Sequence, residues 1–510
     1  MTRFMIGIDN LGHSCVKITK GNIDPVTEPD GNTASFLYNS KVAADVKLAV
    51  TDSTPFQTGS RYLPSGSNVN NYQKVLQAPS AGSAAVKDIG VRNSFYGDAI
   101  PYSLPMFDIK TRRLSDGKYI EQNRVRREGR EGYGGAEPGY YETFDRGQSV
   151  WWENRPDTTS NTGDVIGALG NGLLYQGNSY ATGDADQLEK EIVIWRLPAD
   201  NTPILDGAPK APIAGQWSAQ FSKDFCRVAK PGYDVRTASQ TQLAFDSSGR
   251  PLSAIGAADI NLPAGVTRYD LGFAVTPNML ADLFLYVDDV ITFPMSRFNR
   301  SLVAEYWFSG NSIYFDNKQS SACRCRFVVF ANDRAPLTSG DNNFLRQFTS
   351  GGERVMQLLR PGSGNPPAFR DIVLDSRWPC LQILAEDYKP IAAQANRTPP
   401  SGTNSGQSFT VDFKGDGFFP IVKYMTVHHH EEFGKCVKFP QTRITESYNG
   451  SARYHQANSS YCQLTDNQAT FWTFNGNPYN ERYAENRWKF DYVPDPIIGI
   501  RYYILGIPQN

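Results

Sequence analysis

Three consecutive histidines, His428 to His430, are the side chains in this sequence best suited to metal chemistry, and the whole chain has only five histidines. If "KYMTVHHH" forms a strand, His428 and His430 point to the same face. Glu431 and Glu432 follow at once, but they cannot easily reach around the same strand. Two interpretations are open: a polar strand end facing solvent, or a His428–His430 pair that binds a transition metal where several chains meet on a symmetry axis.

Exposed aromatic residues are a second candidate for binding. Trp151, Trp152, Trp472 and Trp488 stand among asparagine, glutamine and arginine residues. Such rings stack on sugars or anchor protein interfaces, although a single tryptophan also serves simply as core packing. We therefore take these four residues as candidates for carbohydrate or interface binding.

The motifs of common enzyme classes are absent from the sequence. There is no phosphate-binding GxxxxGK[ST], no GxGxxG, no GxSxG and no HExxH. Adjacent acidic pairs such as Asp288 and Asp289 would face opposite sides of a strand, which is poor geometry for a glycosidase. Cys323 and Cys325 share a face of a predicted strand, either as small buried hydrophobes or as a disulfide formed after release. We predict a non-enzymatic protein that needs no cofactor.

Composition favours an all-β protein of several domains. The chain has 510 residues, more than a single core usually holds, and 40% of them are hydrophobic. Its 44 glycines and 32 prolines, with 12% aromatic residues, favour short strands and many turns. A net charge of −1 argues against nucleic-acid binding. No stretch is apolar enough to span a bilayer, so we expect folding in a cytoplasm and no membrane insertion.

The sequence repeats itself. "CVKITKGNIDPVTEP" from Cys15 aligns without a gap on "CRVAKPGYDVRTAS" from Cys226. Each phrase is followed by an apolar pair, then Asp or Asn, then Ser. "IVLDS" from Ile372 is a third version, with no lysine-glycine phrase directly before it. This pattern predicts a duplicated module.

The repeats and the Pro/Gly-rich connectors between them predict antiparallel β-sandwich modules with few short helices. The spacing of apolar residues in the second connector predicts short helical turns. The expected divisions are a module at 1–200 with a long polar and aromatic insert at about 108–190, a module at 221–333, a linker with short helical turns at 334–369, and a C-terminal module at 370–510.

The repeated phrase has the composition of a turn. Lys230-Pro231-Gly232 combines a fixed φ with a permissive residue. Asp234 can hydrogen-bond the local backbone as the chain leaves that turn, and Asp246 can cap the turn after the next strand. We predict a structural role for these five residues.

The phrases "RVAKPGYDVRTAS…LAFDS" and "RYYILGIP" resemble a module of tailed-bacteriophage tail and tail-tip structural proteins, in which Lys-Pro-Gly-Tyr-Asp-Val leads into a Phe-Asp-Ser strand. The similarity covers about half of the chain at the level of motifs, and Asn39 replaces the aspartate in the first copy. The motifs are structural and identify no catalytic residue.

This resemblance implies a non-enzymatic virion component, made in the host cytoplasm and placed in a tail tip, baseplate or fibre. Its expected partners are other tail proteins and further copies of itself in a symmetric assembly, with host attachment as an added role. The alternative is a fibre that binds or degrades host surface polysaccharide.

Overall fold

The protein is all-β, as predicted. The computed structural model describes residues 3–41, 72–75, 86–87, 90–93, 106–113, 116–123, 126–130, 152–153, 188–195, 214–222, 225–229, 232–238, 243–246, 254–276, 279–293, 302–317, 321–331, 337–341, 344–379, 381–392, 407–430, 434–438, 440, 443–447, 453–455, 459–474, 479–484, 487–492 and 497–509. In these ranges the chain forms strands, two 3-10 turns, η1 (Thr33–Ser35) and η3 (Phe369–Asp371), and no α-helix. The same ranges hold no helix of the length and apolarity that a bilayer crossing requires.

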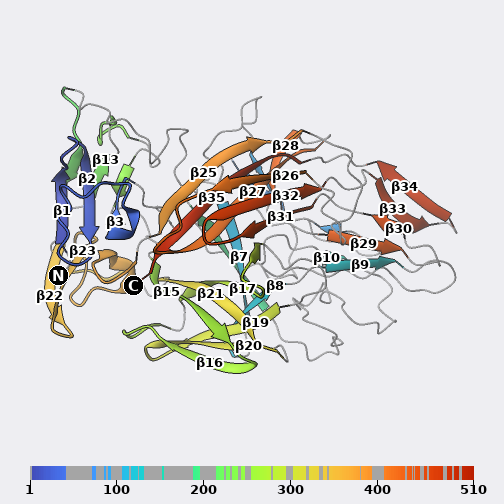
Figure 1. Cartoon of the computed structure of the whole chain (residues 1–510), viewed down its shortest axis with the longest axis horizontal. Helices are drawn as coiled ribbons and strands as arrows, with labels where there is room; N and C mark the ends of the chain where they lie inside the picture. Colours follow the sequence, from blue (N-terminus) through green and yellow to red (C-terminus); the bar gives the residue numbers. More distant parts are fainter. Residues whose placement is uncertain are drawn as a thin grey trace.

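One three-stranded antiparallel sheet occurs three times and builds one end of the molecule (Figure 1). In each sheet the second strand lies in the middle. The three units are β1 (Arg3–Ile8), β2 (Ser14–Thr19) and β3 (Phe36–Asn39) in unit 1; β12 (Ala219–Phe221), β13 (Cys226–Ala229) and β14 (Leu243–Asp246) in unit 2; and β22 (Leu345–Ser350), β23 (Glu353–Leu359) and β24 (Ile372–Asp375) in unit 3. We call units 1 to 3 together the end module.

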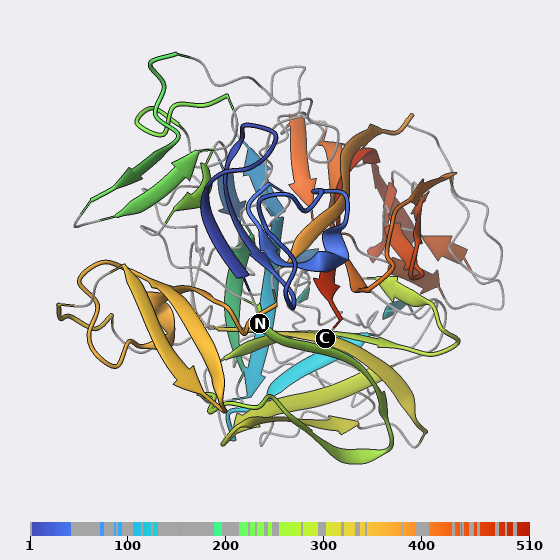
Figure 2. The ribbon, with the colours of Figure 1, turned by 60° about the vertical axis from the view of Figure 1, so that its left-hand side comes forward.

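The three units share an irregularity that marks them as copies of one motif. The middle strand shifts register against the third strand directly after Ile18, Val228 and Leu358, respectively. These three equivalent side chains are buried in a single apolar cluster. The units therefore surround a common pseudo-threefold axis, and Figure 2 shows them side by side as blue, green and gold ribbons.

Unit 3 corrects the prediction for residues 334–369. The residues predicted to form helical turns are the hairpin β22–β23, because Gly351 and Gly352, both with positive φ, form the turn between two strands. The opening phrase of the repeat is also present, as Arg360-Pro361-Gly362 directly after β23. The sequence does not reveal this copy readily, because the segment between Gly362 and Ile372 lacks the Asp-x-x-Thr sequence of the other two copies.

Beyond the end module, the chain forms three equivalent hairpins. They are β7 (Met106–Arg113) with β8 (Tyr119–Asn123), β17 (Leu280–Tyr286) with β18 (Ile291–Phe293), and β27 (Phe418–His430) with β28 (Gly434–Lys438). The second strand of each hairpin pairs with a strand from another part of the chain: β8 with β19 (Leu302–Ser309), β18 with β31 (Ser459–Leu464), and β28 with β6 (Gly90–Asn93). The hairpin of the first repeat therefore pairs with a strand of the second repeat, that of the second repeat with a strand of the third, and that of the third repeat with a strand of the first.

The first strand of each hairpin lies in an inner sheet with a common order. The three sheets are β11 (Leu188–Trp195) with β7; β15 (Ala254–Leu262), β21 (Cys323–Phe330) and β17; and β25 (Gln382–Pro390), β35 (Ile497–Pro508) and β27. Two outer sheets also correspond, one of β19, β20 (Ser312–Asn317) and β16 (Gly265–Asp270), the other of β31, β32 (Gln468–Phe474) and β26 (Gln407–Asp412). Apolar side chains of the two outer sheets and of the inner sheets that contain β21 and β35 meet in one core cluster.

Short strands complete the structure. β4 (Tyr72–Val75) pairs with β6, and β33 (Tyr479–Ala484) pairs with β34 (Arg487–Tyr492) at the end of the molecule opposite the end module (Figure 1). The others are β5 (Val86–Lys87) with β10 (Trp152–Glu153), and β9 (Arg126–Arg130), β29 (Arg443–Ser447) and β30 (Arg453–His455) in one sheet.

Sheets cross every predicted module boundary. The sheet that begins at β11 contains strands from 106–195 and from 265–317, and the sheet that contains β18 continues with β31, β32 and β26. The repeated motif was visible in the sequence, but the exchange of strands between repeats was not. The predicted boundaries therefore do not separate one sheet from another.

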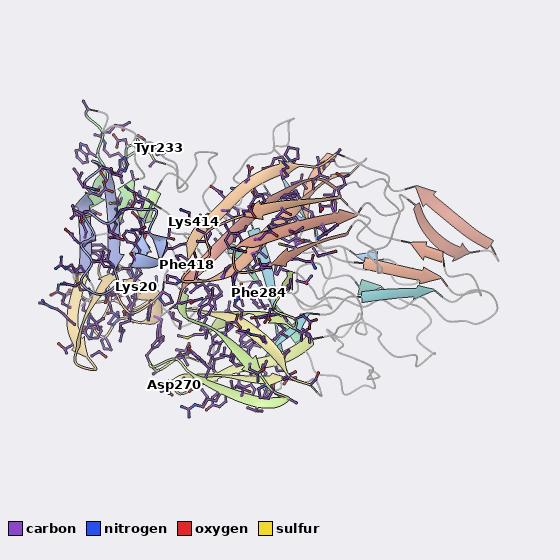
Figure 3. All side chains as sticks on the ribbon, in the orientation of Figure 1. Lys20, Tyr233, Asp270, Phe284, Lys414 and Phe418 are labelled. Atoms are coloured by element: carbon purple, nitrogen blue, oxygen red, sulfur yellow. The ribbon has the colours of Figure 1, made fainter. Side chains whose placement is uncertain are left out.

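The end module is fixed to the body by hydrogen bonds. The buried Gln382 side chain on β25 donates to the carbonyl oxygens of Thr33 and Phe36 in unit 1, at 3.3 and 3.2 Å. Lys20 Nζ donates to the carbonyl of Gln509. Figure 3 labels Lys20 in the end module and Phe418, which begins β27 where the body meets it.

Candidate functional site

A buried centre of three charged residues joins the three hairpins. Asp282 on β17 forms ion pairs with Lys110 on β7 and with Lys423 on β27, whose Nζ lies 2.7 Å from Asp282 Oδ2. The Asp282 side chain has no exposed surface, and both lysines are buried. Each hairpin therefore supplies one member of the centre.

The charges in this centre stabilise one another. Burial opposes ionisation of Asp282, but the ammonium groups of Lys110 and Lys423 outweigh it and hold the pKa of this carboxyl well below its usual range. Removing one partner from such a centre would leave a buried charge without compensation. Since solvent and substrates cannot reach it, the centre can hold the hairpins in place but cannot carry out catalysis.

Asp282 and Lys423 occupy equivalent positions in two repeats. Asp282 lies opposite Val328 on the neighbouring strand, and Lys423 lies opposite Tyr503. In each inner sheet the register shift comes after the next residue of that neighbouring strand, which is Val329 in one sheet and Ile504 in the other. The repeat has therefore diverged so that opposite charges face each other near the pseudo-threefold axis. Sequence reasoning did not identify this centre. Its only signal was an aspartate inside the apolar run "MLADLFLYV".

A second buried charge network lies in unit 1. Asp9 accepts hydrogen bonds from Lys17 and Lys41, and Asp30 binds the same two lysines at 2.8 and 2.7 Å. Burial opposes ionisation of both carboxyls, but the hydrogen bonds from Lys41 and Lys17 keep the pKa of each below its usual range. This network stabilises the turns of unit 1.

The buried His13 lies beside this network. Both of its ring nitrogens lack a hydrogen-bond partner among the described residues, although its backbone N–H donates to Asp9. Burial, aided by the charge of Lys41, lowers the pKa of His13. The neutral imidazole is therefore the form that this site favours.

The repeated phrase forms a turn, and Asp234 has the local role predicted for it. Its carboxylate accepts the N–H of Arg236 at 2.9 Å and forms an ion pair with the same arginine. In unit 1, Asp24 accepts the N–H of Val26 at 3.0 Å in the same way. The two segments that align in the sequence thus fold into the same turn.

Gly232 has a φ of 84°, in the left-handed region that favours glycine. Lys230 and Pro231 lie outside the described residues. Asp246 is the last residue of β14, opposite Arg227, and its side chain is not among those described. The predicted roles of Lys230, Pro231 and the Asp246 side chain stay predictions.

Of the four candidate tryptophans, the structure describes only the side chain of Trp472. This residue is half-buried on β32, stacks with Tyr461 at 6.2 Å between ring centroids, and donates its indole N–H to Gln463 at 3.2 Å. Trp152 begins β10 and Trp488 lies on β34, but their side chains, and the whole of Trp151, lie outside the described residues. The structure does not bring the four together in one described site.

The histidines lie on β27, as the strand prediction required. His428 pairs with Cys436 and His430 with Gly434, so the two occupy alternate positions on the strand. Their side chains lie outside the described part of the chain, and the metal interpretation stays a prediction. Within the described part, no group of three or more His, Cys, Asp or Glu side chains is placed to hold a metal ion.

Cys323 and Cys325 are buried on β21 and form no disulfide, in agreement with their interpretation as small hydrophobes. Burial raises the pKa of Cys323 to about 11, so its thiol is protonated at neutral pH. These two cysteines therefore serve in packing.

Comparison with known proteins adds no assignment to this geometry: the chain matches no protein-family model, no curated protein and no solved structure.

Proposed function

We propose that this chain is a non-enzymatic structural component of a bacteriophage virion, in the tail tip, baseplate or a fibre, where it joins other virion proteins. The observation that carries the proposal is the closed exchange of strands among the three hairpins. Each repeat completes a sheet of another repeat, and a buried ion-pair centre joins all three hairpins. Such an arrangement suits a part that must resist mechanical separation.

The described charged residues also favour a structural role. Asp282 and Asp9, two buried carboxyls whose pKa values are held well below the usual range, lie in ion-pair networks with lysines. Catalytic groups need access to a substrate, and these have none. The resemblance to tail modules, carried by the turn at Gly232 and Asp234, is in keeping with this role.

A chain with three repeats also affects the symmetry expected of the assembly. Three repeats around an axis make one chain equivalent in outline to a homotrimer. A single copy can therefore occupy a position at which other proteins would need three subunits, and further copies then associate through contacts outside this axis.

Purified particles of the phage that encodes the chain test the proposal. We expect quantitative mass spectrometry to find the chain at a constant copy number per particle after gradient purification. Purified chain incubated with host surface polysaccharide should release no reducing ends. Absence from particles would refute a virion role, and release of reducing ends would favour a polysaccharide-degrading protein instead.

A further inference from the structure

Two short sheets lie toward the end of the molecule opposite the end module (Figure 1). One is formed by β9, β29 and β30, and the other by β33 and β34. The outer strands β31 and β32 begin and end at the pair Ser459 and Phe474. β30 ends at His455, four residues before this pair, and β33 begins at Tyr479, five residues after it. Connections of this length reach no more than about 14 to 18 Å, so both sheets are held near one point.

Arginine residues are concentrated on one face of the three-stranded sheet. Parallel pairing places Arg126 opposite Arg443, and another row across the three strands contains both Arg130 and Arg453. The two rows are an even number of residues apart along each strand, so all four arginines belong to the same face. Glu128 is the one acidic residue among the positions of this face.

This distribution of charge favours an anionic ligand. Like charges directly opposite one another destabilise a sheet, and arginine is rarely buried unless it is paired. A ligand with carboxylate, sulfate or phosphate groups would compensate the arginines, because a guanidinium binds such groups through two parallel hydrogen bonds. The rows at Arg126 and Arg130 are about 13 Å apart along β9, a distance that a polymer spans and a single small anion does not.

The two-stranded sheet carries aromatic residues on one face. Its antiparallel register gives this face the positions Tyr479, Glu481, Tyr483, Trp488, Phe490 and Tyr492. Five of these six residues are aromatic and none is aliphatic. Aromatic rings provide flat surfaces on which sugar rings stack, and the polar atoms of tyrosine and tryptophan can still form hydrogen bonds. A two-stranded sheet has little stability alone, so a ligand on this face would also stabilise the sheet.

We propose that this end of the molecule binds an acidic polysaccharide, whose anionic groups pair with the arginines of the β9–β29–β30 sheet and whose sugar rings stack on the aromatic face of β33–β34. The arginines alone suit any polyanion, and the aromatic residues alone suit any sugar. An acidic polysaccharide is the polymer that satisfies both sheets. Glu128 and Glu481 favour it over a nucleic acid, since carboxylates accept hydrogen bonds from sugar hydroxyls but repel closely spaced phosphates. The inference rests on the proposed function in one respect, because a virion component meets such a polymer on the host surface.

Calorimetric titration of the purified full-length chain with polymers of defined charge tests this proposal. The probes are polygalacturonate and dextran sulfate as acidic polysaccharides, dextran as the neutral one, and oligothymidine as a single-stranded nucleic acid. We expect at least one acidic polysaccharide to bind about tenfold or more tightly than dextran and oligothymidine do. Its affinity should fall as the salt concentration rises.

Neighbouring arginines on opposite faces of β9 provide a matched pair of variants. Arg126→Gln removes a charge from the proposed face, whereas Arg127→Gln removes the same charge from the next position, which belongs to the other face. We expect affinity for the acidic polysaccharide to fall at least about fivefold in Arg126→Gln and to change less than about twofold in Arg127→Gln. Equal thermal midpoints confirm that both variants fold.

A second pair of variants tests the aromatic face. Trp488→Ala should weaken binding at least about fivefold, whereas Asn480→Ala, on the other face of the same sheet, should have little effect. If Trp488→Ala lowers the thermal midpoint, the two arginine variants decide the result.

The outcomes separate this inference from the proposed function. Equal losses in Arg126→Gln and Arg127→Gln would reveal a general attraction of charge and overturn the site. Dextran or oligothymidine bound as tightly as the acidic polysaccharides would identify a neutral sugar or a nucleic acid as the ligand and overturn the proposal, as would a failure of every probe to bind. These results leave the copy number of the chain in particles untouched, so the virion role would stand. The expected binding by a chain that is absent from particles would keep the polysaccharide site and refute the proposed function.

Discussion

Lys423 Nζ lies 2.7 Å from Asp282 Oδ2, and this contact joins two residues that hold the same position in different repeats. In an exact trimer, identical side chains would meet near the axis and like charges would repel. Here the repeats differ at that position, so the carboxylate of one lies between the ammonium groups of the other two hairpins. The centre thus requires three different hairpins in a fixed order.

Replacing Asp282 tests this centre. Asp282→Asn keeps the size of the side chain but removes the carboxylate that pairs with the buried Lys110 and Lys423. We expect the free energy of unfolding to fall by about 3 to 5 kcal/mol, as for other broken buried ion pairs. Chemical denaturation monitored by tryptophan fluorescence measures the change.

The matched control is Asp270→Asn on β16. Asp270 pairs with Arg268 at 3.5 Å on the surface, with both side chains more than half exposed, and Figure 3 labels it. We expect a change within about 0.5 kcal/mol there, because exposed ion pairs contribute little. Equal losses for the two variants would show that the buried centre is not special.

A second prediction concerns the turn of unit 2. Gly232→Val forces a β-branched side chain into the left-handed region at φ 84° and should cost at least about 1 to 2 kcal/mol. Hydrogen exchange of the amides in β12 to β14 should become faster. Gly31→Val is the control, since Gly31 does not have a positive φ and an added Cβ there meets open space. Normal exchange in Gly232→Val would refute the turn assignment.

The attachment of the end module gives a third prediction. Gln382→Leu removes the amide that donates to Thr33 O and Phe36 O, leaving buried carbonyl groups with fewer donors. We expect a loss of about 1 to 3 kcal/mol and faster amide exchange in unit 1. Gln407→Leu removes a comparable amide contact to Ala392 O at an exposed site and should change little. If both variants exchange like the wild type, Gln382 does not hold the module to the body.

A fourth prediction is the pH dependence of stability. Because burial lowers the pKa of His13, the folded chain resists its protonation, whereas the unfolded chain takes up that proton near pH 6.5. His13 therefore decreases stability as the pH falls from 7 toward 5, with a slope of at most about 1.4 kcal/mol per pH unit. His13→Leu should reduce this decrease, as measured by denaturant unfolding at each pH.

The carboxyl groups near His13 affect stability in a lower range of pH. Asp9 and Asp30 have lowered pKa values in the folded chain, so their contribution is complete above the unfolded value of about 3.9 and disappears as the pH falls below it. A decrease between pH 7 and 5 that is identical in His13→Leu would assign it to other groups. Lys17 also acts on His13, and its raised pKa keeps it charged throughout this range.

The sequence predicted the all-β class and the local turns, because glycine, proline and the Asp24 and Asp234 positions act through their nearest neighbours. The alignment of the two phrases without a gap corresponds to identical turns. The third copy is harder to recognise in the sequence because the loop between Arg360-Pro361-Gly362 and Ile372 lacks the Asp-x-x-Thr sequence that begins at Asp24 and Asp234 in the other units. The spacing of apolar residues in the hairpin β22–β23 is close to that of a helix, and it therefore predicted helical turns where the chain forms two strands.

The buried centre could not be predicted in this way. The partners of Asp282 lie on other hairpins, and no local pattern states which strands will be neighbours. The exchange of β8, β18 and β28 between repeats is equally invisible, since each strand is short and its partner is chosen by three-dimensional packing. Composition and turn chemistry determine the elements, whereas these contacts depend on the topology.

The position of β35 (Ile497–Pro508) has a consequence during synthesis on the ribosome. This strand lies between β25 and β27, so both remain open edges until residue 508 has emerged. The nascent chain must therefore keep two exposed strands from pairing with neighbouring polypeptides while translation proceeds. A product that stops before β35 lacks the strand that closes the third inner sheet, and we expect such premature products to be aggregation-prone.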